Sequence, residues 1–390
     1  MAGARPAARA RVTTSSLIHP DQTWALWAVL LVVAALGLWG ERTRIGGRLS
    51  AMVLALLGTF ALANLGIIPP DAPVYDAVWT YVVPIAVPLL LFRADLRRIL
   101  REAGPTLLAF AAGAVGTVAG SFVAAYLVNM GPPTWQLAAV FCATYIGGSM
   151  NYVAVAQAVD LRSSDLLAAG VAADNLVMAA YFLILFSLPS VGWLRRLFTR
   201  RHESTPEPEP GEVVTVRQGP GLLGLATALA VSGSFCAVGY ALESLVGVKG
   251  TAILIITLLV VGAATLMPKR MKALEGADLV GTYLMHIFFA AIGASAHIAT
   301  VLRVGPKLFL FTTVILVVHL AIILVAGWLL KLDLAEVVIA SNANVGGPTT
   351  AAAMATARRW DQLVIPAILC GTLGYAIANF IGIAVGYALR

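Results

Sequence analysis

Charged residues are scarce in this sequence of 390 residues. Only 12% of the residues are Asp, Glu, Lys or Arg, whereas 60% are hydrophobic and the mean hydropathy is +0.89. A soluble globular domain carries about 25% charged residues. The composition therefore excludes a soluble domain and predicts an all-α polytopic membrane protein, embedded in a lipid bilayer as a multi-pass protein of a bacterial-type plasma (inner) membrane.

Cysteines and catalytic motifs are also scarce. Cys142, Cys236 and Cys370 each lie in an apolar segment without CxxC or metal-ligand spacing, so we interpret them as packing residues. The sequence contains no HExxH, GxSxG or GxxxxGK[ST] motif, which argues against a metalloprotease, a serine hydrolase and ATP coupling. We therefore expect no enzyme activity and no cofactor apart from a coupling ion.

Apolar segments make up most of the chain, six in each half. Most approach the ~20 residues that a helix needs to cross a bilayer. The segments lie near residues 23–40, 50–67, 76–92, 105–129, 135–160 and 163–187, and then near 220–245, 249–268, 278–297, 308–330, 332–360 and 362–387. Between the halves, alternating Pro and Glu residues predict a solvated tether. The predicted organisation is a polar tail (1–22), a first membrane repeat (23–192), a cytoplasmic linker (193–219) and a second membrane repeat (220–390).

The stretch 332–360 is an apolar run with a polar interruption. Pro348 lacks an amide hydrogen, and Gly346 and Gly347 are free in φ, so one unbroken helix is excluded. Unwound backbone within a bilayer must line a cavity or be covered by protein, so the interruption predicts a binding site. An extramembrane loop between two short helices is the alternative. The candidate substrate-binding residues here are Ser341, Asn342, Gly346, Gly347, Thr349 and Thr350.

A similar interruption occurs about two hundred residues earlier, in the sequence YIGGSMNYVAV. It contributes Gly147, Gly148, Ser149 and Asn151. The surrounding segments can be aligned at a similar offset. The aligned pairs are Leu54–Gly66 with Ile253–Thr265, Tyr81–Leu91 with Tyr283–Ala291, Gly104–Pro105 with Gly305–Pro306, and Asn151 with Asn344. Internal duplication with a site at the junction of the repeats is a pattern of secondary transporters.

The basic residues distinguish two topologies. If all twelve segments cross the membrane, the 26 Lys and Arg residues divide equally between the two sides. If the two interrupted segments are re-entrant hairpins and the N-terminus lies outside, eighteen of the 26 lie inside, as the positive-inside rule requires. Three Arg residues of the N-terminal tail then lie on the unfavoured side. Five crossings in each half is an odd number, so the second repeat has the opposite orientation in the membrane and the repeats are inverted. The alternative is that the interrupted segments are broken helices that cross fully and that there is one further crossing, which would also give inversion.

Asp174 is a carboxylate in the middle of the apolar sequence GVAADNLVMAAYF. An isolated charge at that depth is unfavourable, so Asp174 needs a cation, a proton or a basic partner. We predict that it binds a coupling Na⁺ or carries a transported proton; a protonated Asp that packs helices is the alternative. Amide and hydroxyl oxygens are suitable ligands for a hard cation. The candidate cation ligands are Asp174, Asn175, Ser149, Asn151 and Asn344.

Other polar residues predict the nature of the solute. Half-helices that begin near Met150 and Pro348 would present unpaired N–H groups, which favour an anionic group on a small organic solute. Asn379, with Tyr375, lies roughly opposite Asp174 in the duplicated half and is a further candidate lining residue. His286 and His319 could each relay protons, but a packing role is favoured.

The pairing of GGSMNYVAVA with SNANVGGPTTAAAMA, over essentially the whole chain, resembles the family of membrane proteins called domain of unknown function 819. Through that family, the resemblance also implies a relation to the cation–proton antiporter and anion transporter superfamily. The resemblance implies a panel domain and a core domain, with the two interrupted helices crossing at the bilayer midplane, and by analogy a homodimer. The segment VAADNLVMAAYF also resembles the antiporter helix that carries an acidic pair, in which Asp occupies the second position. Here Asp174 occupies the first position of the pair and Asn175 the second.

Three functions follow from these patterns. A secondary active transporter, a Na⁺- or H⁺-coupled symporter of a small and anionic organic solute, fits best. A monovalent cation–proton antiporter is the alternative, disfavoured by Asn175. An intramembrane enzyme that uses Ser149, His286 or Asp174 is the alternative from a different class. Nucleic acid is not expected as a partner despite the net charge of +7, because the basic residues lie in loops between apolar segments.

Overall fold

A computed structural model describes residues 16–43, 51–199, 221–247 and 251–390. The described residues are helical apart from turns and one β-bridge between Thr199 and Asp333. The prediction of an all-α protein is therefore confirmed. Most of the predicted polar tail (1–22) and of the predicted linker (193–219) lies outside the described residues.

Among the described residues, eight helical stretches are long and apolar enough to cross a membrane, so the prediction of a multi-pass membrane protein is confirmed. They are α1 (Thr23–Glu41), α3 to α4 (Pro73–Leu91), α6 (Gly104–Leu127), α9 (Ser164–Ser187, with a following turn), α11 (Leu222–Val246), α14 (Ala277–Ala294), α15 (Ile298–Leu329) and α18 (Val364–Ala388, with a preceding turn). Two shorter apolar helices, α2 (Ala51–Asn64) and α12 (Thr251–Leu266), correspond to the other two predicted crossings.

The two interrupted segments are each resolved into a pair of short helices. The first pair is α7 (Thr134–Gly147) and α8 (Met150–Ala158), and the second is α16 (Leu334–Val345) and α17 (Pro348–Ala357). The side chain of Gln136, near the start of α7, donates a 2.8 Å hydrogen bond to the carbonyl of Val159, just past α8. The first pair is therefore a helical hairpin with both open ends on one side.

Some boundaries differ from the sequence-based prediction. Helix α15 begins at Ile298, ten residues before the predicted start near 308, and contains Pro306. Pro306 is exposed, so water can hydrate the carbonyl that its missing N–H leaves free. Hydropathy did not indicate the short helices α5 (Leu96–Glu102), α10 (Gly192–Leu197) and α13 (Pro268–Lys272), because two of them are strongly basic and all are too short to span a bilayer.

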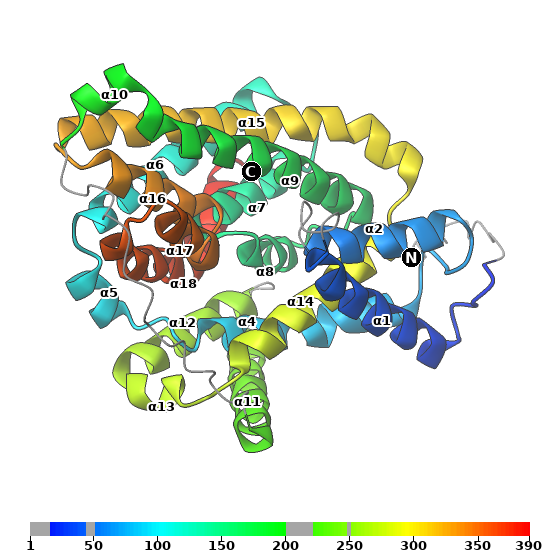
Figure 1. Cartoon of the computed structure of the whole chain (residues 1–390). Helices are drawn as coiled ribbons and strands as arrows, with labels where there is room; N and C mark the ends of the chain where they lie inside the picture. Colours follow the sequence, from blue (N-terminus) through cyan, green and yellow to red (C-terminus); the bar gives the residue numbers. More distant parts are fainter. Residues whose placement is uncertain (1–15, 44–50, 200–220, 248–250) are drawn as a thin grey trace, which may run out of the picture.

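The helices form two groups, each held together by its own contacts (Figure 1). The α14 group consists of α1, α2, α3 to α4, α11, α12 and α14; the α18 group consists of α6 to α9 and α15 to α18. Within the α18 group, α6 and α15 approach closely because Gly120 offers no side chain: a Cβ there would lie 2.6 Å from the carbonyl oxygen of Ile315. Contacts between the groups are sparser and involve mainly α8, α9 and α18 against α2, α4, α12 and α14.

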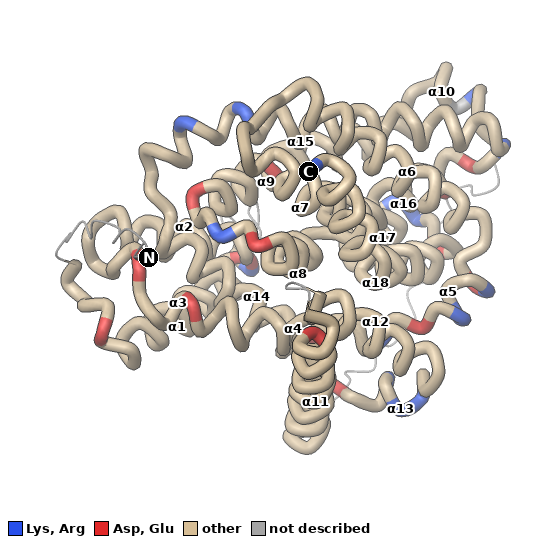
Figure 2. The backbone as a smooth tube through the Cα atoms, turned by 180° about the vertical axis from the view of Figure 1, so that it is seen from behind, with Lys and Arg blue, Asp and Glu red and all other residues tan. Residues whose placement is uncertain are grey.

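Chain segments that were predicted to share a side of the membrane lie together. On the predicted outer side, the backbone N–H of His297 donates to Asp165, and that of Ile298 donates to Asn64. On the predicted inner side, Lys272 pairs with Asp95 at 3.7 Å, and Figure 2 shows basic residues at both α5 and α13. The contacts therefore join parts of the chain that are distant in sequence at each of these two ends.

Candidate functional site

The tips of the two helix pairs meet inside the α18 group. Gly148 has a φ of 76° and Gly347 a φ of 85°, values that glycine adopts readily and other residues rarely. A Cβ placed on Gly148 would lie 3.5 Å from Gly346 and 3.5 Å from the Cα of Gly347. Two glycine breaks that are far apart in the sequence are thus in direct contact.

Helix α18 holds both tips in place with two glycines one turn apart. A Cβ on Gly374 would lie 2.5 Å from the carbonyl oxygen of Ile146, and one on Gly371 would clash with Pro348 and Gly347. Close approach of this kind is typical of small residues at helix interfaces in membranes. Gly371 therefore contacts the second tip and Gly374 the first.

A small cavity lies beside the first tip, between α4, α8 and α18. Its volume of ≈ 20 Å³ has room for about one water molecule. Its polar lining comes from Asn151, Tyr375 and Asn379, and Val87, Leu90 and Leu91 close it from α4. The cavity thus lies between the two helix groups.

The asparagines of this cavity are only partly hydrogen-bonded. Nδ2 of Asn151 donates to the carbonyl of Gly147 at 2.8 Å, and Nδ2 of Asn379 makes a long 3.4 Å contact with Oγ1 of Thr257. Oδ1 of Asn379 is buried without a partner in the described part of the chain. An unsatisfied buried acceptor is costly, so this oxygen is available for a water, a cation or a ligand donor.

Asp174 is buried in the middle of α9, with 3% of its surface exposed. Its carboxyl group lies close enough to the hydroxyl of Tyr145 on α7 to interact with it, although neither Oδ1 of Asp174 nor that hydroxyl makes a hydrogen bond of standard geometry among the described residues. Asp174 does not line the small cavity. The half-buried side chain of Asn175 donates to the carbonyl of Val171 on its own helix.

The polar residues before the second tip lie within helix α16, and only Gly346 and Gly347 separate it from α17. The expectation that Ser341, Asn342 and Asn344 belong to unwound backbone is therefore wrong. The N-terminus of helix α16 is stabilised by a capping box. The Asp333 side chain accepts from the Ala335 N–H, and the Glu336 side chain accepts from the Asp333 N–H. The helix continues through the polar residues because their side chains find partners on other helices.

Asn342 and Asn344 have different environments. Oδ1 of Asn342 accepts a 2.7 Å hydrogen bond from Thr350, which joins α16 to α17 across the tip. Nδ2 of Asn344 donates to the carbonyls of Phe110 and Ala340, whereas its Oδ1 is buried without a partner among the described residues. Asn344 is the member of this pair that retains an unused acceptor.

His319 of α15 is fully buried in a hydrogen-bond chain that the sequence did not indicate. Its Nδ1 lies 2.8 Å from the Gly113 carbonyl, which can only accept, so Nδ1 carries the proton. In the neutral ring, Nε2 then accepts from the hydroxyl of Ser341 at 3.0 Å, and Ser341 accepts from Tyr181 at 2.6 Å. Protonation of Nε2 would reverse the direction of this chain, which joins α15, α16 and α9.

The structure therefore divides the predicted site residues. Gly147, Gly148, Gly346 and Gly347 form the meeting tips, and Asn151 and Asn379 share the cavity. Ser149 and Thr350 are half-buried beside the tips, whereas Thr349 is exposed. Asn151 follows its glycine break and Asn344 precedes the other, so the two aligned asparagines occupy different places relative to their breaks. Sequence reasoning missed Tyr145, Tyr181 and Thr117.

Comparison with known proteins gives two matches. A family model described as "Protein of unknown function (DUF819)" matches residues 28–390, which include both hairpin tips and Asp174. The "Uncharacterized membrane protein YjcL" of Bacillus subtilis (strain 168) is 36% identical over 389 residues, which cover 95% of this chain and 98% of the relative.

Proposed function

Because the chain belongs to the DUF819 family of membrane proteins, we propose that it is a secondary active transporter: a Na⁺- or H⁺-coupled symporter of a small, anionic organic solute. The observation that carries this proposal is the contact between the two glycine tips, in a helix group that also buries polar atoms without a hydrogen bond of standard geometry among the described residues. These atoms are Oδ1 of Asp174, Oδ1 of Asn344, Oδ1 of Asn379 and the hydroxyl of Tyr145. Polar groups buried inside a membrane protein cost free energy, so their presence there suggests that function requires them.

Equivalent packing in the two halves supports inverted repeats with interrupted helices. A Cβ on Gly37 of α1 would clash with α2 at the Ala51 carbonyl, and a Cβ on Gly239 of α11 would lie 3.4 Å from the Ala252 carbonyl of α12. The two contacts are related by an offset of about two hundred residues, as are Gly148 and Gly347. In this proposal the first hairpin enters from the outer side and the second from the inner side.

The two helix groups supply the moving parts. We assign the α14 group as the panel and the α18 group as the core of a fold related to the cation–proton antiporter and anion transporter superfamily. The cavity between them, at ≈ 20 Å³, is far smaller than the several hundred Å³ that an organic ligand occupies. The site is therefore closed in this structure, and solute access requires the core to move against the panel.

Helix ends favour an anionic group on the solute. Helix α8 begins at Met150 and α17 at Pro348, and both begin at the meeting tips. The N-terminal ends of two helices, each with the partial positive charge of a helix dipole, thus lie at the tips, and the first of them borders the cavity. Coupling by a cation is assigned to Asp174, whose charge would otherwise stand alone. Antiport is the alternative, and no residue is assigned a catalytic role.

Thermal-shift screening of the purified chain tests the proposal. Organic anions are added with and without Na⁺, because a ligand that binds only the folded state raises the melting temperature, and the rise grows with the ratio of ligand concentration to Kd. We expect at least one small carboxylate to stabilise the protein, and its effect to grow when Na⁺ is present at neutral pH. Anion stabilisation that is independent of both Na⁺ and pH would contradict coupled symport.

Asn151 provides a second measurement at the same site. Asn151→Ala removes a polar group that lines the cavity and leaves a bound solute with an unmet hydrogen bond, so its apparent Kd should rise about tenfold. Asn129→Ala, in an exposed turn away from the tips, is the matched control and should leave solute affinity unchanged. Equal affinities for the wild-type protein and the Asn151 variant would remove this residue from the site.

A further inference from the structure

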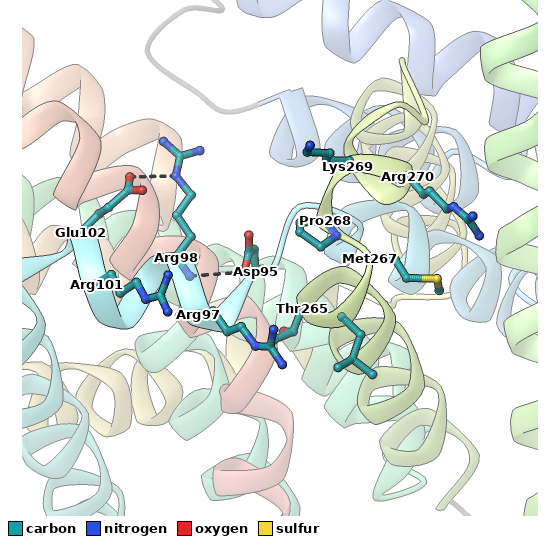
Figure 3. Close-up of a pocket in the computed structure, with 11 residues that line it drawn as sticks. Asp95, Arg97, Arg98, Arg101, Glu102, Thr265, Met267, Pro268, Lys269 and Arg270 are labelled. Carbon is teal, nitrogen blue, oxygen red and sulfur yellow. Dashed lines mark hydrogen bonds and ion pairs between the residues drawn. The ribbon is translucent and has the colours of Figure 1, made fainter.

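A basic groove lies on the predicted inner side, far from the hairpin tips in sequence and between α5 and the turn from α12 to α13 (Figure 3). The groove is open and has a volume of ≈ 800 Å³. Five of its lining residues are cationic and two are acidic. The cationic residues are Arg97, Arg98, Arg101, Lys269 and Arg270, and the acidic residues are Asp95 and Glu102.

Internal ion pairs leave most of this positive charge unused. Arg98 pairs with Glu102 at 2.8 Å, as Figure 3 shows, and Asp95 pairs with Lys272 just outside the groove. In the described part of the chain, no ion pair involves the four remaining cations of the lining. The groove therefore attracts an anion that the described residues do not supply.

The position of the groove favours a lipid as the source of that anion. It lies where α4 ends, α6 begins and α12 ends, which is the boundary of the membrane-spanning helices. Leu100 and Leu266 are each 69% exposed beside the cationic residues. Exposed leucines next to juxtamembrane Arg and Lys residues match the acyl chain and the phosphate of a phospholipid.

The groove also joins the two helix groups. Helix α5 packs against α18 of the α18 group, whereas α13 follows α12 of the α14 group. At the base of the groove, the backbone N–H of Leu96 donates a 3.2 Å hydrogen bond to Oγ1 of Thr265, the last polar residue of α12. An anion bound between Arg97 or Arg101 on one side and Lys269 on the other would contact both groups.

We propose that this groove binds the phosphate of an anionic phospholipid from the inner leaflet. The bound lipid bridges α5 and α13 and stabilises the closed arrangement of the two groups. Binding itself is independent of the proposed transport function; only the effect of the lipid on transport rests on that function. The site is formed by residues outside the hairpins, so it is a second site and not part of the solute path.

The test is the affinity of the purified, delipidated full-length chain for short-chain phosphatidylglycerol, with zwitterionic phosphatidylcholine, which has no net charge, as the comparison. The double variant Arg97→Gln/Arg101→Gln should bind phosphatidylglycerol roughly thirtyfold more weakly. Each lost cation removes about 1 kcal/mol of attraction to the anionic lipid, and the two losses together convert to that change in Kd. Lys269→Gln/Arg270→Gln, on the opposite wall, should show a similar loss. Arg303→Gln/Lys307→Gln, an exposed basic pair on α15, is the matched control and should bind normally.

Three results would overturn the proposal. The first is unchanged phosphatidylglycerol affinity in both groove variants, and the second is an equal loss in the α15 control. The third is inorganic phosphate that competes at the same concentration as the lipid, which would identify a soluble anion as the ligand. Because lipid affinity is measured without a transport assay, a protein that transports nothing but binds the lipid rejects only the proposed function.

Discussion

Asp174→Asn is expected to abolish ion-driven solute uptake in proteoliposomes while the protein remains folded. The substitution preserves the shape of the side chain but removes the carboxylate. That group lies in the middle of α9, beside Tyr145 of α7. A coupling Na⁺ loses its anionic ligand, and a coupling H⁺ loses its carrier. Any Na⁺-dependent rise in the melting temperature should disappear together with the uptake.

The stability of the Asp174→Asn variant should not fall with its uptake activity. Burying a carboxylate whose Oδ1 has no described partner costs free energy, so the neutral amide should leave the melting temperature unchanged or raise it. Asp76→Asn, at an exposed position of α3, is the matched control and should preserve uptake. Sodium- or proton-driven flux that persists in the Asp174 variant would remove this residue from the mechanism.

Much of the fold could be predicted because hydropathy reports directly on burial in lipid. The twelve apolar segments correspond to the long helices, the two shorter apolar helices and the two hairpins, with α15 as the largest boundary error. The glycine pairs at the two interruptions were informative for a local reason, since Gly148 and Gly347 both adopt positive φ. Such constraints act on one residue and are visible in sequence.

The detailed site could not be predicted, because its partners are remote in the chain. Sequence alone placed Ser341 in unwound backbone, but a helix is maintained there since its hydroxyl bonds Tyr181, 160 residues away, and His319. Thr117, which lies 2.8 Å from the Nδ1 of His319 across 202 residues, carries no local signal at all. The separation of Asp174 from the small cavity likewise depends on how α8, α9 and α18 pack.

Gly374→Ala is expected to destabilise the protein by about 1–3 kcal/mol, the usual cost of overpacking a close interface. The new methyl group would lie 2.5 Å from the carbonyl oxygen of Ile146 and 2.9 Å from the Cα of Gly147. Both are backbone atoms, so no side-chain rotation can relieve the clash, and α18 must move away from α7. Thermal unfolding in detergent should show a melting temperature several degrees lower, and the displaced first tip should weaken solute binding.

Gly233→Ala provides the matched control, because it makes the same substitution in a helix where nothing lies within 4 Å of the new Cβ. Alanine is favoured over glycine in a helix interior by about 1 kcal/mol, so this variant should be as stable as the wild type or more stable. Gly374→Ala should therefore lower the melting temperature, whereas Gly233→Ala should leave it unchanged or raise it. A Gly374 variant that unfolds at the wild-type temperature would mean that α18 does not hold the first tip by close contact, and the arrangement of the site around it would have to be revised.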